Sequence, residues 1–122
     1  MEIVTTKLND EALAPHISEA HLLMDACLLA GEILMANGSE ITRVEDVILR
    51  IGRAAGIEKI QVYALLNAIT VSFPTQGLTQ MRAIPPRIQT MDMEKIVAVN
   101  DLTRKFTAHK IVLTDLYDCL EK

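Results

Sequence analysis

The spacing of apolar side chains changes twice along this sequence, and this change constrains the fold more than any other feature. Up to Ala55 apolar residues recur every three or four positions, between Ile60 and Ile84 they alternate with polar residues, and then the helical spacing returns. The pattern predicts helices at 17–36 and 42–55, strands at 60–64, 69–73 and 78–84, a third helix after Thr90 or Asp92, and a fourth at 113–120. The strand connections are short, which makes neighbouring strands antiparallel. The predicted fold is therefore α+β, of order ααβββαα: two N-terminal helices, a three-stranded antiparallel meander and two C-terminal helices.

The length and charge of the chain limit its organisation and its partners. The 122 residues suit one domain, and half of them are apolar, which is enough for a proper core. Residues 1–15 end at a proline and are expected to form a flexible N-terminal arm, which leaves 16–122 as a single domain. The net charge of −4 argues against nucleic acid as a partner. We see neither a signal peptide nor an apolar run of bilayer length, so we expect a soluble chain.

The first predicted helix is apolar around most of its circumference. Its polar residues fall within a narrow arc, and they are Ser18, His21, Asp25 and Glu32. Such a helix is either central in its domain or packed on a partner as well. We expect a homo-oligomer that uses this helix or an open strand edge, with a monomer as the alternative. Cys27, in the same helix, is expected to be a small buried hydrophobe in a reducing compartment.

The junction between the first two helices carries the densest group of specific polar residues. Asn37-Gly38 predicts a helix end at which Gly38 has a positive φ. Thr42 and Glu45 have the spacing of a capping box for the second helix, and Ser39 is a rival N-cap.

Arg43 lies in the first turn of that second helix, where the helix dipole disfavours a cation. We therefore expect Arg43 and Glu45 to make fixed interactions, with Glu40 as the candidate partner of Arg43.

The sequence contains no recognisable catalytic or metal-binding pattern. It has no G-x-S-x-G elbow, no nucleophile and base that can be placed together, and no set of zinc ligands at suitable spacing. His16 and His21 do not share a helical face, and His109 sits in a Lys-containing connector. We therefore predict no catalytic residue, no metal and no cofactor.

Four motifs in order resemble the N-terminal soluble domain of the threonine/serine exporter family. They are A-G-E-I-L-M-A-N-G, S-E-I-T-R-V-E-D-V-I-L-R-I, T-Q-M-R-A-I-P-P-R and K-I-V-A-V-N-D-L-T-R-K-F, and the likeness spans about 22–120. The chain has Ser39 where family members usually have Ala. The residues that carry the motif, and that the resemblance marks as functional candidates, are Gly38, Glu40, Arg43, Glu45, Arg82 and Asn100.

The resemblance implies a function that the residues alone would not suggest. It implies a cytoplasmic accessory or regulatory domain of a proton-gradient-driven exporter of threonine, serine or related small acids. The domain would lie at the cytoplasmic face of the membrane, without catalysis of its own. Its expected partner is the membrane-spanning portion of a longer exporter, or a separate membrane subunit. The alternative is a soluble hydrolase-like domain attached to a membrane protein, which the lack of a placed nucleophile–base pair disfavours.

Overall fold

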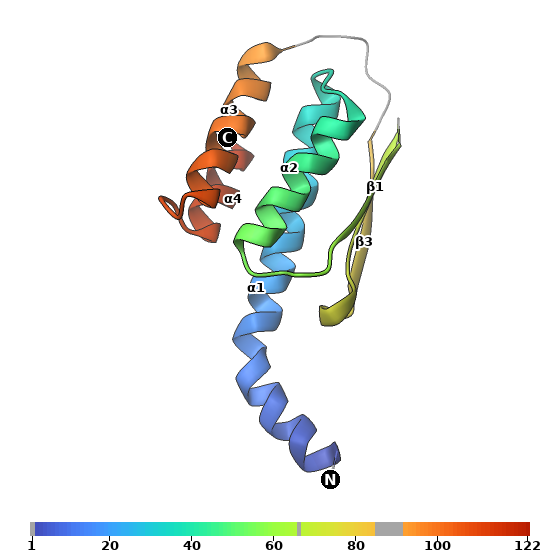
Figure 1. Cartoon of the computed structure of the whole chain (residues 1–122), viewed down its shortest axis with the longest axis vertical. Coiled ribbons are helices and arrows are strands. Elements are labelled where there is room, and N and C mark those ends of the chain that lie inside the picture. The colour runs from blue at the N-terminus through green and yellow to red at the C-terminus, as the bar shows by residue number, and fades with distance from the viewer. Residues whose placement is uncertain (1, 66, 85–91) are drawn as a thin grey trace.

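The computed structural model describes residues 2–65, 67–84 and 92–122, with side chains from residue 19 onward. Within these ranges the chain forms four α-helices and one three-stranded antiparallel sheet, in the predicted order (Figure 1). The elements are α1 (Glu2–Ala36), α2 (Ile41–Ala54), β1 (Gln61–Leu65), β2 (Ala68–Phe73), β3 (Leu78–Ala83), α3 (Met93–Thr107) and α4 (Leu113–Glu121). The predicted α+β fold is confirmed.

The first helix begins earlier than the sequence pattern predicted. Its backbone is helical from Glu2, rather than from Ile17, and it passes through Pro15. The prediction treated that proline as a helix boundary, which is a probable boundary rather than an obligatory one. The residues at 7–14 include several good helix formers, and Pro15 removes only one backbone donor. Whether residues 1–15 move as a flexible arm stays a prediction.

The sheet is a simple meander of order β1-β2-β3. Helices α1 and α2 cover one of its faces, and α3 and α4 pack against the helices. Strand β2 alternates strictly, and its inward side chains Ile69, Val71 and Phe73 are fully buried. The turn between β2 and β3 is a short 3-10 segment, Pro74–Gln76, closed by Gly77 in the left-handed conformation with φ 68°. The predicted short turns therefore fix an antiparallel register.

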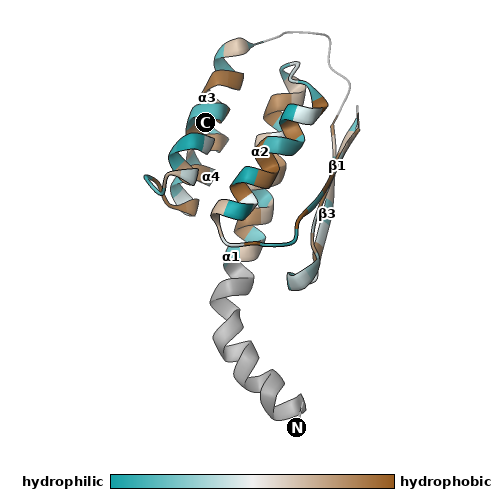
Figure 2. Cartoon of the chain, in the orientation of Figure 1, coloured by the Kyte–Doolittle hydropathy of each residue, from teal (hydrophilic) through white to brown (hydrophobic). Residues whose placement is uncertain are grey.

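Helix α1 is the central element of the domain. It contacts α2, α3, α4, β2 and β3. Its described apolar side chains lie mostly in the core, where Met24, Cys27 and Leu34 have no exposed surface. In Figure 2 the hydrophobic residues of the helices gather where the helices face one another and the sheet. Within residues 19–36 the apolar side chains are thus mostly buried in the core, as the central-helix alternative predicted.

Two glycines end helices, and for Gly38 the sequence predicted this. Gly38 has φ 88°, and Gly56 has φ 97°. Behind Gly56 the amide of buried Ile57 donates to the carbonyl oxygen of Gly52 at 3.1 Å, which completes a Schellman motif. The same arrangement ends α1, because the Ser39 amide donates to the Leu34 carbonyl oxygen at 2.9 Å.

Helix α3 is capped at both ends by non-glycine residues. At its start the Asp92 carboxylate accepts from the backbone amides of Glu94 (3.0 Å) and Lys95 (3.4 Å), which confirms the predicted helix start. At its end His109 occupies the left-handed position with φ 59°, and the Lys110 amide donates to the Lys105 carbonyl oxygen at 2.9 Å.

Of the helices in the described ranges, none combines the length and the apolar character needed to cross a membrane.

Candidate functional site

A small polar groove lies between α2 and α3, which pack against each other. Its volume is about 160 Å³. From α2 it is lined by Arg43, Asp46, Val47 and Arg50, and from α3 by Asn100, Thr103 and Arg104. Spacings of three, four and seven residues place each set on one side of its helix. Two residues marked by the family resemblance, Arg43 and Asn100, therefore meet across this groove.

The groove is positively charged, although the whole chain carries a net charge of −4. Three guanidinium groups and one carboxylate line it. The Arg50 Nε donates to the Asp46 carboxylate at 2.8 Å, an i, i+4 pair on α2. Arg104 is 3.4 Å from Asp101. The Lys105 hydrogen bond, followed by the Lys105 charge, lowers the pKa of the Asp101 carboxyl, and Arg104 adds to this effect.

Arg43 makes no hydrogen bond or ion pair with any residue in the described part of the chain, and its side chain is exposed. The predicted pair with Glu40 is wrong. Glu40 is the N-cap residue of α2, outside the helix, and is itself exposed. An exposed ion pair is worth at most about 1 kcal/mol, too little to hold two long side chains together. Arg43 is therefore available to an anion in the groove.

Glu45 does make a fixed interaction, but not the predicted one. Its carboxylate accepts a hydrogen bond from the backbone amide of Ala64 at 3.3 Å, and this bond ties α2 to β1. The capping box prediction is wrong, because α2 begins at Ile41 and has no side-chain cap, so Thr42 lies inside the first turn. An edge strand such as β1 leaves backbone donors without a strand partner, and a carboxylate satisfies one of them. The rival cap, Ser39, has a buried hydroxyl without a hydrogen-bond partner in the described residues.

Arg82 belongs to a different polar cluster. Its guanidinium lies 3.2 Å from the Glu32 carboxylate, which connects β3 to α1, and the two side chains are 32% and 31% exposed. Nearby, desolvation raises the pKa of the Tyr117 hydroxyl, and the charges of Glu121 and Asp25 raise it further. The pair joins residues 50 positions apart, so no local spacing could have revealed it.

The six residues marked by the resemblance thus occupy different places. Arg43 and Asn100 share the groove, Gly38 and Glu40 form the junction before α2, Glu45 contacts β1, and Arg82 pairs with Glu32 on α1. Three further residues of the groove, Asp46, Arg50 and Arg104, are not among the site residues predicted from the sequence. The helical pair of Asp46 and Arg50 was a visible signal, whereas nothing in the sequence placed Arg104 opposite α2.

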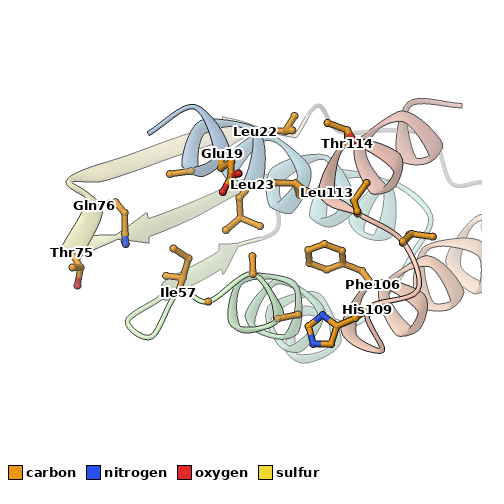
Figure 3. Close-up of a pocket in the computed structure, with 16 residues that line it drawn as sticks. Glu19, Leu22, Leu23, Ile57, Thr75, Gln76, Phe106, His109, Leu113 and Thr114 are labelled. Atoms are coloured by element: carbon orange, nitrogen blue, oxygen red, sulfur yellow. The ribbon is translucent and has the colours of Figure 1, made fainter. Parts of the chain in front are cut away.

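A second, larger hollow is mainly apolar. It has a volume of about 1140 Å³ and is lined by α1, the end of α2, the Pro74–Gln76 turn and the α3–α4 connection. Figure 3 shows Leu23, Phe106 and Leu113 around it, with Glu19 and His109 on opposite sides. Those two are its titratable lining residues. Because they do not converge, this hollow offers apolar surface rather than a reactive centre.

No group of three or more His, Cys, Asp or Glu residues in the described part of the chain is arranged to hold a metal ion.

A family model described as "Putative threonine/serine exporter" matches residues 25–122, well over half of the chain. The chain belongs to this family. No curated protein and no solved structure matches it.

The match to the threonine/serine exporter family confirms the resemblance seen in the sequence motifs. It includes both walls of the α2–α3 groove, together with the Glu32–Arg82 pair. Membership relates the chain to threonine/serine exporters and so to a membrane-associated system.

Proposed function

We propose that this chain is a cytoplasmic accessory domain that regulates a proton-gradient-driven exporter of threonine, serine or related small acids, without catalysis of its own. The observation that carries the proposal is that Arg43 and Asn100 line the same positively charged groove. Family membership supplies the transported class, and the groove supplies a place where that class can be recognised.

The groove matches the functional groups of a small hydroxy amino acid. The unpaired guanidinium of Arg43 can donate two parallel hydrogen bonds to an α-carboxylate. The Asp46 carboxylate, which is open to solvent, can accept from the α-ammonium group, and the Asn100 amide can pair with a side-chain hydroxyl. The groove, with a volume of about 160 Å³, has room for a small amino acid.

Binding at this position has a direct consequence for the domain. A ligand held by both α2 and α3 stabilises the arrangement in which these helices are packed together. A membrane-spanning portion or subunit that contacts the domain would therefore meet a different population of conformations when threonine is abundant. This is the physical basis for a regulatory role in export.

The first experiment measures ligand binding by thermal unfolding of the purified chain. Threonine and serine should raise the melting temperature, and a ligand at 100 times its Kd contributes about 2.7 kcal/mol. Arg43→Gln should remove the effect. Arg53→Gln is the matched control, because Arg53 is also exposed on α2 but does not line the groove. Threoninol, which lacks the carboxylate, should not stabilise the chain. A small dicarboxylate tests the related acids. No stabilisation by any of these compounds would refute the binding proposal.

The second experiment measures export by cells that carry the complete exporter. The cells are loaded with a threonine-containing peptide, and threonine efflux is measured as the internal threonine concentration rises. This dependence should differ between Arg43→Gln cells and parent cells, whereas Arg53→Gln cells should match the parent. A protonophore should abolish the efflux in all strains. Equal efflux from Arg43→Gln and parent cells would contradict a regulatory role. Hydrolysis of esters or amides by the purified chain would contradict the absence of catalysis.

A further inference from the structure

Two of the residues that line the α2–α3 groove are buried, whereas its charged residues are exposed. Val47 on α2 and Thr103 on α3 are each only 4% exposed. The exposed lining residues are Arg43, Asp46, Arg50 and Arg104. The groove therefore has a charged rim and a small buried floor, formed by Val47 and Thr103. This floor is apolar on the side of α2 and carries a hydroxyl on the side of α3.

The Thr103 hydroxyl can accept a hydrogen bond from a ligand but cannot readily donate one. Its Oγ1 donates to the Val99 carbonyl oxygen at 2.8 Å, one turn back along α3. A hydroxyl has a single proton, so this bond leaves Thr103 with acceptor capacity. Asn100 lies three residues earlier on the same side of α3, and its amide has donors as well as an acceptor. Asn100 can thus donate to the oxygen of a ligand hydroxyl whose proton goes to Thr103.

Val47 supplies the apolar half of the floor. It lies four residues after Arg43, one turn along the same side of α2. A small amino acid whose carboxylate is held by Arg43 at the rim extends its side chain toward the floor. A methyl group on its β-carbon then leaves water to contact Val47, which is favourable.

We infer that Val47 and Thr103 are the specificity-determining residues of the groove, and that they select threonine over serine and over amino acids without a β-hydroxyl. This inference rests on the proposed function, because it takes Arg43 as the carboxylate site. Threonine carries both groups that the floor matches, a hydroxyl and a methyl on one carbon atom. Serine lacks the methyl group, and valine has the shape of threonine without the hydroxyl.

The size of the discrimination follows from the two missing groups. Loss of one buried methyl group should weaken the binding of serine about fourfold relative to threonine. Loss of the hydroxyl should weaken the binding of valine at least about fivefold, because the polar groups of Asn100 and Thr103 are then covered without a partner. L-allo-threonine has the opposite configuration at the β-carbon and cannot make both contacts at once, so it should bind no better than serine.

Isothermal titration calorimetry of the purified chain with each of these four amino acids tests the inference. The parent chain should show the two affinity ratios given above. Thr103→Val keeps the shape of the side chain and removes its hydroxyl, so the preference for threonine over valine should fall severalfold. Thr103→Ser retains the hydroxyl and should retain this preference.

Substitutions of Val47 test the methyl contact. Val47→Ala should bring the ratio of threonine affinity to serine affinity close to one. Val47→Ile keeps the floor filled and occupies the place of the ligand methyl group, so it should favour serine. Val44→Ala is the matched control, because Val44 is also a buried valine on α2 but does not line the groove. It should keep the parent ratio. An affinity ratio measured on folded chain does not depend on the stability that a substitution removes.

The outcomes distinguish failure of this inference from failure of the proposed function. Threonine and serine binding that depends on Arg43, with affinity ratios unchanged by the Val47 and Thr103 substitutions, would overturn the inference and leave the proposed function intact. Equal affinities of the parent chain for threonine, serine and valine would do the same. Failure of every amino acid to bind would overturn both.

Discussion

Gly31 is the position where the sequence and the tertiary structure make opposite predictions about the effect of an alanine. It lies in the interior of α1, where helix propensity favours Ala over Gly by about 1 kcal/mol. In the folded domain, however, a Cβ at this position would come within 2.8 Å of Ile69 Cδ1 and 3.0 Å of Ile48 Cδ1. Both isoleucines are fully buried, so their ends have little room to move aside.

The expected magnitude follows from these two opposing effects. Extra methyl groups in a well-packed core cost about 1–3 kcal/mol, which exceeds the propensity gain. Gly31→Ala should therefore lower the free energy of unfolding by about 1 kcal/mol, which corresponds to about 3–5 °C in melting temperature for a domain of this size. Urea denaturation measures the free energy directly.

A double-mutant cycle separates crowding from other effects of the alanine. Ile69→Val removes the nearest carbon atom and should itself cost about 0.5–1.5 kcal/mol. In that background Gly31→Ala should be neutral or stabilising, which gives a coupling energy of about 1 kcal/mol or more. Equal destabilisation in both backgrounds, or stabilisation of the parent chain by Gly31→Ala, would show that the reasoning about crowding is wrong.

Four further predictions concern the helix ends and the buried thiol. Gly38→Ala should destabilise the domain by about 1 kcal/mol, since an L-residue at φ 88° is strained; an unchanged melting temperature would contradict this. His109→Gly should do the opposite and stabilise by up to about 1 kcal/mol, because His109 holds φ 59°; a lower melting temperature would mean that the imidazole makes contacts that outweigh the strain. Burial raises the pKa of the Cys27 thiol from 9.0 to about 12, so an aromatic disulfide reagent should modify exposed Cys119 at once and Cys27 only after unfolding. The stabilisation from protonated Cys27 is complete below pH 9 and is lost as pH rises toward 12, by up to about 4 kcal/mol; Cys27→Ala should reduce this alkaline loss in pH-dependent denaturation curves.

The sequence by itself determined the element order and several helix ends. The period of the apolar residues reports which side chains can share a buried face, and this property is local to each segment. Gly38 and Gly56 end their helices because only glycine enters the left-handed region without a steric cost. Asp92 caps α3 because its carboxylate reaches amides two and three residues away. Each of these outcomes depends on neighbours in the chain.

The tertiary structure decided which polar side chains meet. Glu45 has the spacing of a helix cap, yet its carboxylate bonds to Ala64 on a strand, because packing of α2 against β1 brings an unpaired amide within reach. Arg43 and Asn100 share a groove only because α2 and α3 lie together. Exposed charge pairs are worth a few tenths of a kcal/mol to about 1 kcal/mol, so they follow the packing of the core rather than direct it. Their partners cannot be deduced from spacing along the chain.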